Sequence, residues 1–416
     1  MESVPLFTNK KEIFVTFMVL LILFCFSLGF EYIKYKDLVR KPFYTTQAKV
    51  LNHYQKSSKK SKPYDVFKLR SEEGFTFYTI SWKHRNISTG DSVTIKFRTK
   101  HIKFVEYMKS FFTRYIFLSK ATKQHDSYLD RIKSYVRNQH KTFETKEIFS
   151  ALFFSSAISK KSREKIQKLG ISHLIAISGF HLGLLSLILF FLFTPVYRLF
   201  QDRYFPYRNI KADLSVIVFF FLFLYMYVID FSPSFLRSFV MAVFGFFLFS
   251  RHIKIVSFLT LLLSICFILV LFPKLIFSIS FWFSVSGVFY IFLFLKHFSN
   301  FNKILIFILL NFWVYLAMLP IVHFVFPVFT PLQLASPLLS MLFTVFYPVE
   351  LFAHLMNFGG LFDSGIEYLL NLKTNFYEIM TPIWFLIPYL LLSLLGIFYR
   401  WLAVLSISLS FGIFLI

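Results

Sequence analysis

Long apolar runs dominate this sequence and restrict what it can fold into. One run covers residues 13–30, and further runs follow from residue 173 to the end. Apolar stretches of about 20 residues are typical of membrane-spanning helices. The chain is also 56% hydrophobic, above the roughly 45–50% of soluble domains. The pattern predicts a polytopic α-helical membrane protein with about ten transmembrane helices.

The expected spans cover residues 13–30, 173–199, 213–230, 234–250, 255–272, 275–295, 304–326, 332–356, 383–398 and 401–416. One tilted or kinked span is the alternative for the last two. The first span is expected to stay on the chain, because Glu31-Tyr-Ile-Lys34 follows it in place of a small-residue cleavage site. Residues 1–30 would then hold a cytoplasmic N-terminus and the first transmembrane helix.

The polar region after the first span divides into two predicted parts. Partial alternation of β-branched and aromatic residues predicts short strands at 47–54, 64–70, 75–82 and 92–98. Such strands favour a small OB-like β-barrel domain over residues 31–105. From 106 to 148 the pattern turns helical and basic, which predicts an amphipathic connector along the membrane surface. Residues 149–416 form the membrane domain.

Basic residues gather in this polar region of a chain whose net charge is +24. Such a field attracts phosphate polymers or anionic lipid head groups, although a solvated basic surface is the plainer interpretation. Single-strand binders combine aromatic stacking platforms with positive grooves. Candidates of both kinds are Phe75, Phe77, Tyr78, Trp82, Lys68, Arg70, Lys83 and Arg85. The alternative is that most of these aromatic rings form the core of the barrel.

Loop charges predict the orientation, because short loops rich in Lys and Arg stay in the cytoplasm. One set of alternate loops carries Arg198, Arg203, Arg208, Lys211, Arg251, Lys254, Lys296 and Lys303, and the other set carries only Lys274. The first set is therefore predicted to be cytoplasmic. Residues 31–145 then lie outside the cytoplasm. Glu350 and His354, an i,i+4 pair, would lie near a cytoplasmic end as a hydrogen-bonded surface pair.

Polar and small residues are concentrated in 170–183, at the start of a predicted span. His173, Ser178, Gly179 and His181 lie here, and polar groups at membrane depth are costly. Ser178-Gly179 either sits within one helix or breaks it and exposes backbone groups to a cavity. The two histidines either join packed helices by hydrogen bonds or line a translocation path. Their spacing does not favour zinc.

Two later segments carry further candidates. In 232–237, Ser232 and Pro233 suit a helix start, which puts Ser234 and Arg237 in the first turns of a span. Arg237 either snorkels or pairs with Asp230, or it faces phosphates as a cation in a pore. In 278–287, Ser280, Ser284 and Gly287 share one helix face, which favours helix packing.

Enzyme motifs are missing from the sequence. It contains no GxxxxGK[ST], HExxH or GxSxG pattern. Its two cysteines, Cys25 and Cys266, both lie in apolar runs, which favours neither a disulfide framework nor a thiolate metal site. We expect no enzymatic activity, no metal and no cofactor.

The segment 173–181, His-Leu-Ile-Ala-Ile-Ser-Gly-Phe-His, closely resembles the signature of the ComEC family of competence proteins. Further matches follow in family order. Residues 232–237 resemble its Pro-Ser-x-x-Arg element, 281–287 its Phe-x-Leu-Ser-x-x-Gly element, and 320–337 its late segment. The family's N-terminal domain is OB-like. The sequence departs from the family at Phe180, Gln333 and Ser336, in lacking a cysteine pair in the outer domain, and in ending without the metallo-β-lactamase-like domain of longer members.

The resemblance implies an inner-membrane channel that passes single-stranded DNA into the cytoplasm during natural transformation. The path candidates are His173, Ser178, Gly179, His181, Ser234, Arg237, Ser284 and Gly287. Expected partners are single-stranded DNA, the lipid bilayer, an extracytoplasmic DNA receptor and a cytoplasmic motor or single-strand-binding protein. The alternatives are a transporter of another anionic polymer or small solute, and a membrane scaffold that binds DNA without conducting it. The oligomeric state stays open.

Overall fold

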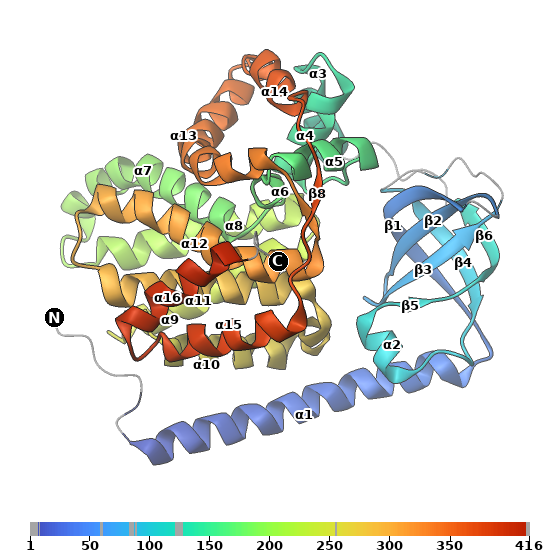
Figure 1. Cartoon of the computed structure of the whole chain (residues 1–416), viewed down its shortest axis with the longest axis horizontal. Coiled ribbons are helices and arrows are strands. Elements are labelled where there is room, and N and C mark those ends of the chain that lie inside the picture. Colours follow the sequence, from blue (N-terminus) through green and yellow to red (C-terminus); the bar gives the residue numbers. More distant parts are fainter. Residues whose placement is uncertain are drawn as a thin grey trace.

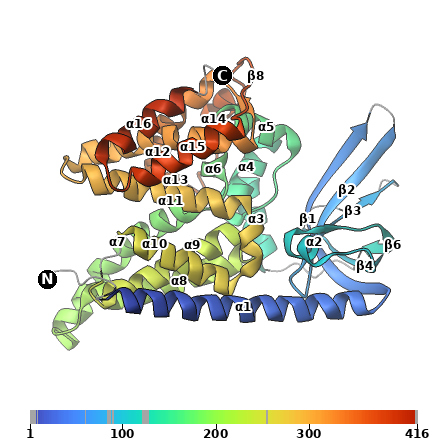
Figure 2. The same ribbon diagram turned by 60° about the horizontal axis from the view of Figure 1, so that its bottom comes forward.

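A bundle of apolar helices and a separate curled β-sheet are joined by one long helix (Figure 1). The computed structural model describes residues 7, 9–58, 61–82, 87, 90–120, 128–253 and 256–412. The joining helix, α1 (Lys10–Arg40), has 31 residues. It lies along the bundle beside α10 (Phe258–Leu271) before reaching the sheet (Figure 2). Tyr35 and Leu38, near its end, pack into the core of the sheet.

The sheet has six strands in the order β5-β3-β2-β1-β4-β6. They are β1 (Phe43–Ser58), β2 (Ser61–Ser71), β3 (Thr76–Ser81), β4 (Ser92–Arg98), β5 (Phe111–Phe112) and β6 (Tyr115–Lys120), with α2 (Phe104–Lys109) before β5. The first four confirm the strands predicted from alternation. Burial alternates along β3 and β4, so one face packs around rings such as Phe77 and Phe97.

The last two strands correct the prediction of a helical connector after residue 105. β5 pairs in parallel with β3, whereas β6 pairs antiparallel with β4. Only Thr113 and Arg114 separate these strands, so one chain segment contacts both ends of the sheet, which curls. Phe111 and Tyr107 are each 2% exposed. They are therefore core residues, and the sheet continues past the expected boundary at 105. A closed OB-like barrel stays a prediction.

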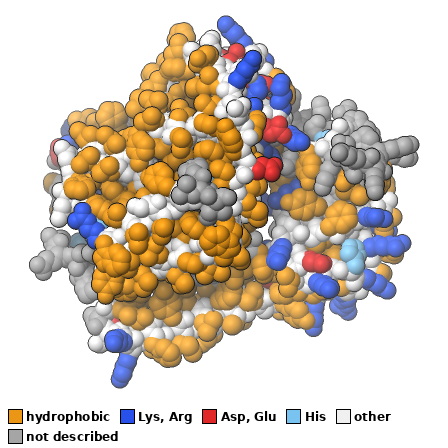
Figure 3. Space-filling view, viewed as in Figure 1, with side chains coloured by type: hydrophobic (Ala, Val, Ile, Leu, Met, Phe, Trp, Pro, Cys, Tyr) orange, Lys and Arg blue, Asp and Glu red, His pale blue; other side chains and the backbone are white. Residues whose placement is uncertain are grey.

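The bundle contains seven helices that are long and apolar enough to cross a membrane, counted over the described residues and including α1. The others are α7 (Gly179–Tyr204), α8 (Ile210–Val228), α9 (Pro233–Ser250), α11 (Ile279–Phe298), α12 (Lys303–Val325) and α13 (Ser336–Leu355), the last preceded by η2 (Pro331–Ala335). Shorter apolar helices are α10, α15 (Ile383–Leu395) and α16 (Arg400–Ser410). Each of the ten expected spans coincides with one of these helices, of which seven have the length and hydropathy of a membrane span. Apolar side chains cover the visible face of the bundle (Figure 3).

Shorter elements complete the helical part of the chain. They are α3 (Tyr128–Asn138), α4 (Phe143–Phe154), α5 (Lys160–Lys168), α6 (Ser172–Ile175), η1 (Pro273–Phe277) and α14 (Asp363–Leu370). Two short strands, β7 (Val328–Phe329) and β8 (Tyr377–Glu378), pair antiparallel. They bring together the segment before α13 and the segment after α14.

One contact contradicts the predicted positions around α13. His140 Nε2 lies 3.0 Å from His354 Nε2. Residues 31–145 were expected outside the cytoplasm and His354 near a cytoplasmic end, so the two expectations exclude each other. Both residues are buried, so the expected surface pair of Glu350 and His354 is wrong as well.

Candidate functional site

The segment 170–183 forms a helix break followed by a long helix. α6 ends at Ile175, and α7 begins at Gly179 with Ser178 as its N-cap. The Ser178 backbone N–H donates to His181 Nδ1 at 3.3 Å. A capping box with His in place of Glu or Gln therefore satisfies a free donor at the helix start. Of the two predicted alternatives, the structure has the broken helix.

Both histidines of this segment contact α13. His173 Nε2 lies 3.2 Å from Ser340 Oγ. The fully buried His181 ring packs edge-on against Phe343 and Tyr347, with centroids 5.5 and 5.1 Å away. In this conformation both side chains join packed helices.

A second group of polar residues, the polar junction, joins α7, α9 and α11. It consists of Gly179, Ser234, Arg237, Ser238 and Ser280. A Cβ on Gly179 would lie 2.9 Å from Ser238 Oγ, so α7 and α9 approach closely there. Arg237 Nη2 donates to Ser280 Oγ at 2.9 Å and to Ser234 Oγ at 3.4 Å. The junction therefore unites candidates from three separate sequence segments.

Arg237 does not take either of the plainer roles expected for it. Its side chain is 4% exposed, so it does not snorkel. Asp230 pairs with Lys49 at 2.7 Å, and Arg237 binds hydroxyl and carbonyl oxygens instead. Among the described residues no carboxylate forms an ion pair with Arg237, and its Nε has no hydrogen-bond partner. A buried guanidinium without a counter-ion suits transient contact with an anion.

The other two path candidates on α11 are not part of the junction. Ser284 lies one turn beyond Ser280, and a Cβ on Gly287 would meet no atom within 4 Å. The close helix packing expected at Gly287 is therefore not found.

The outer face of the sheet is basic and carries exposed rings. Lys68 lies 5.5 Å from the centre of the Tyr78 ring, and Trp82 is 58% exposed. Arg70 of β2 lies opposite Thr76 of β3 in the strand register, on this same face. Phe75 and Phe77 are 3% and 0% exposed, so a base cannot stack on them. For these two rings the alternative of a core position is confirmed. Lys83 and Arg85 lie outside the described residues.

Sequence reasoning missed an aromatic residue on the same face. Phe43, at the start of β1, is 43% exposed and lies under Lys96 and Arg98, at 5.7 and 6.0 Å. Phe117 is opposite Lys96 on β6 and is also exposed. The predicted strand begins at residue 47, and extending its alternation back by four residues reaches Phe43.

The sheet is attached to one end of the bundle by charged contacts. Besides the Lys49–Asp230 pair, Lys274 of η1 lies 2.9 Å from Glu31 of α1. Tyr107 donates its hydroxyl to Glu31 at 3.2 Å, and burial raises the pKa of Tyr107. Asp230 and Lys274 belong to the loops predicted to face away from the cytoplasm.

Comparison with protein families gives a match to the family described as Competence protein, over residues 154–412. The chain belongs to the competence protein family. The match covers the bundle from the end of α4 to the end of α16, including the 173–181 signature and the polar junction. Membership gives this competence protein a role in DNA uptake for natural transformation, with DNA as its substrate. Neither curated proteins nor solved structures gave a match.

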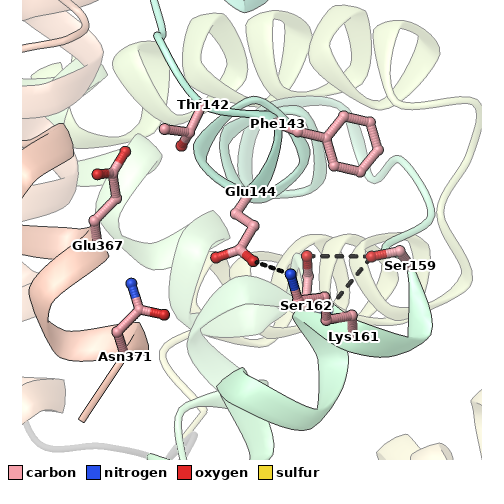
Figure 4. Close-up of a pocket in the computed structure, with 8 residues that line it drawn as sticks. All are labelled: Thr142, Phe143, Glu144, Ser159, Lys161, Ser162, Glu367 and Asn371. Carbon is pink, nitrogen blue, oxygen red and sulfur yellow. Dashed lines mark hydrogen bonds and ion pairs between the residues drawn. The ribbon is translucent and has the colours of Figure 1, made fainter.

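A surface pocket of this competence protein lies between α4, α5 and α14 (Figure 4). Its volume is about 350 Å³. Glu144 points into it and pairs with Lys165 at 2.6 Å and with Lys161 at 3.2 Å, and the Lys165 hydrogen bond lowers the pKa of Glu144. These charges already satisfy one another, so the pocket has the character of a helix-joining ion-pair cluster. Within the described ranges no group of three His, Cys, Asp or Glu could hold a metal.

Proposed function

We propose that this protein conducts single-stranded DNA across the cytoplasmic membrane into the cell. The observation that carries the proposal is where the basic sheet is attached. Lys49 of the sheet binds Asp230 at 2.7 Å, and Asp230 precedes α9, whose first turns hold the buried Arg237. A strand bound on the sheet would thus be delivered to the end of the bundle that contains a guanidinium without a counter-ion.

In this proposal the OB-like outer domain collects the strand. Lys68, Arg70, Lys96 and Arg98 contact phosphates, and Phe43, Tyr78, Trp82 and Phe117 offer faces on which bases stack. Both kinds of contact tolerate any sequence, as uptake of foreign DNA requires. Binding would weaken steeply as salt rises, because phosphate contacts release counter-ions.

Inside the bundle, the path would pass the polar junction and the break between α6 and α7. Pore selectivity depends on lining charge and diameter, and Arg237 supplies positive charge beside hydroxyl groups. His173, His181, Ser178 and Ser284 would shape this path. An extracytoplasmic receptor would deliver the strand, and a cytoplasmic motor or strand-binding protein would drive transport.

We also propose a topology in which α13 does not cross the membrane. β7 before α13 pairs with β8 after α14, so the chain leaves and returns on one face. Between α13 and β8 the one helix is α14, with 8 residues. Such a helix spans about 12 Å, too short to recross a hydrocarbon core of roughly 30 Å. The N-terminus would lie in the cytoplasm, and the sheet, η1, β7 and the end of α13 outside it.

Uptake of labelled DNA by a deletion strain tests the channel. We expect loss of DNA from the cytoplasm while DNA still reaches the outer compartment. Arg237→Gln should reproduce this defect at normal protein levels in the membrane. Arg251→Gln is the matched control, because Arg251 is exposed at the opposite end of α9, and it should import normally. Normal cytoplasmic DNA in the deletion strain, or in cells with well-inserted Arg237→Gln, would refute the channel proposal.

A further inference from the structure

Three chain segments meet around two buried histidines. His140 comes from the turn between α3 and α4, His354 from the end of α13 and Asp363 from the start of α14. His140 Nδ1 lies 2.8 Å from Asp363 Oδ1, and the two Nε2 atoms lie 3.0 Å apart. All three side chains are buried. The His140 ring stacks on Phe149, with centroids 4.1 Å apart, so water is excluded from one side of it.

The partners of the two Nδ1 atoms decide where the ring protons are. His140 Nδ1 faces a carboxylate, which accepts hydrogen bonds when ionised. His354 Nδ1 lies 2.8 Å from the carbonyl oxygen of Glu350, which also only accepts. Each Nδ1 must therefore carry the hydrogen of its neutral ring. Both Nε2 atoms are then left with lone pairs that point at each other across 3.0 Å.

Two facing lone pairs repel, and one additional proton turns this contact into a hydrogen bond. Two carboxyl groups flank the pair, and the hydrogen-bonded Asp363 supplies negative charge for that proton. Asp363 lies at one end of the chain of groups, and Glu350 Oε1 lies 3.4 Å from His354 Nδ1 at the other. Both Glu350 oxygens are buried without a hydrogen-bond partner among the described residues. An ionised carboxyl group in that position is costly unless positive charge lies nearby.

Among the described residues, Lys146 of α4 is a further charged group that acts on the pair. Burial has the largest effect on the pKa of His140 and lowers it, Asp363 raises it, and Lys146 lowers it further, so that the pKa lies below its ordinary value. Lys141 contributes its backbone N–H, which donates to Asp363 Oδ2 at 3.1 Å. Asp363 offsets burial only in part, so the pKa of His140 lies below its ordinary value and the pair takes up its shared proton on the acid side of that value.

We propose that His140 and His354 form a proton-binding site that fastens the segment after α3 to α13 and α14. The site takes one proton, shared between the two Nε2 atoms. A zinc ion is not favoured, because the pair offers two nitrogen ligands and structural zinc sites use four protein ligands. When the proton leaves, the two lone pairs face each other again and the contact opens. The inference does not depend on DNA transport.

The closed contact holds one more proton than the open one, so it is favoured at low pH and lost as pH rises. Above the pKa of the pair, the open fraction should grow by up to about tenfold per pH unit. Backbone hydrogen exchange of the full-length protein in lipid nanodiscs measures this opening. After correction for the intrinsic rate, protection of residues 139–142 and 359–363 should fall as pH rises from about 4.5 to about 7.5, a window set by a histidine pKa lowered from its ordinary value of about 6.5. Peptides from α8 should show no such trend.

His354→Gln makes the test specific. The Gln amide donates an N–H to His140 Nε2 without an extra proton, so protection should stay high and no longer depend on pH. His354→Ala should lower protection at every pH. His297→Gln is the matched control, because His297 bonds the carbonyl oxygen of Gly396, away from the paired histidines. This variant should keep the wild-type dependence of protection on pH.

Three results would overturn the proposal. The first is a wild-type protection that stays constant with pH after the correction. The second is a His354→Gln protein that keeps the wild-type slope. The third is protection that responds to zinc and to a chelator at constant pH, which would make the pair a metal site.

Discussion

At the scale of single residues, Arg237 is the side chain whose environment is hardest to explain by stability alone. It is buried, its Nη2 binds Ser280 Oγ at 2.9 Å, and it has no carboxylate partner among the described side chains. Replacing buried charge by an apolar side chain of similar volume is often neutral or stabilising. Removing one partner of a buried charge is destabilising.

Two substitutions therefore should differ in their effect on the thermal midpoint. Arg237→Met should leave the midpoint unchanged or raise it, while cytoplasmic DNA import is lost. Ser280→Ala, which leaves the guanidinium with one partner fewer, should destabilise by roughly 1.5–3 kcal/mol. Thermal unfolding in detergent, read beside the uptake assay, measures both. A large drop in midpoint for Arg237→Met would mean that Arg237 acts mainly as a structural link between α9 and α11.

At the scale of elements, the approach of α7 to α9 depends on one glycine. A Cβ on Gly179 would lie 2.9 Å from Ser238 Oγ, whereas one on Gly183 would meet nothing within 4 Å. The two glycines are one turn apart on the same helix, so they form a matched pair.

Gly179→Ala should lower stability by about 1–3 kcal/mol, since it overpacks this contact. Gly183→Ala should be neutral or stabilising by up to about 1 kcal/mol, because alanine favours the helix more than glycine does. Adding Ser238→Gly to Gly179→Ala should restore part of the loss. Equal effects of the two alanine substitutions on the unfolding midpoint would contradict the close approach.

At the scale of the whole molecule, the proposed topology has nine crossings, because α13 begins and ends on the outer side. Phe358 follows α13 and is 69% exposed, and Tyr207, in the loop between α7 and α8, is 87% exposed. The proposal puts these residues on opposite sides of the membrane, whereas a crossing α13 puts them on the same side.

Cysteine labelling in intact cells separates the two topologies. In a protein with Cys25 and Cys266 replaced by serine, Phe358→Cys should react with a membrane-impermeant maleimide, as should Tyr54→Cys in the sheet. Tyr207→Cys should react only after the cells are permeabilised. Labelling of Phe358→Cys only after permeabilisation would restore α13 as a membrane span.

Residue patterns predicted much of this architecture, and the failures have physical reasons. Alternation locates four strands, but it does not tell which face is buried, so the sequence alone admits Phe75 and Phe77 as stacking candidates. β5 has two residues, too few for any pattern, so the sequence predicts a connector over 111–120. Length and hydropathy do not tell a crossing helix from one that returns to the same side, so the proposal for α13 rests on contacts between distant segments, the pairing of β7 with β8 and the contact of His140 with His354. The partners of Arg237 and His140 depend on contacts between segments far apart in the sequence.

The unbroken course of α1 has a mechanical consequence. One rigid rod of 31 residues, about 46 Å long, runs from the bilayer to the core of the sheet, where Leu38 is 3% exposed. A tilt of about 10° within the lipid would swing its far end by roughly 8 Å. The ion pairs of Asp230 with Lys49 and of Lys274 with Glu31 oppose that movement. A force on the sheet would therefore change the tilt of α1 within the membrane.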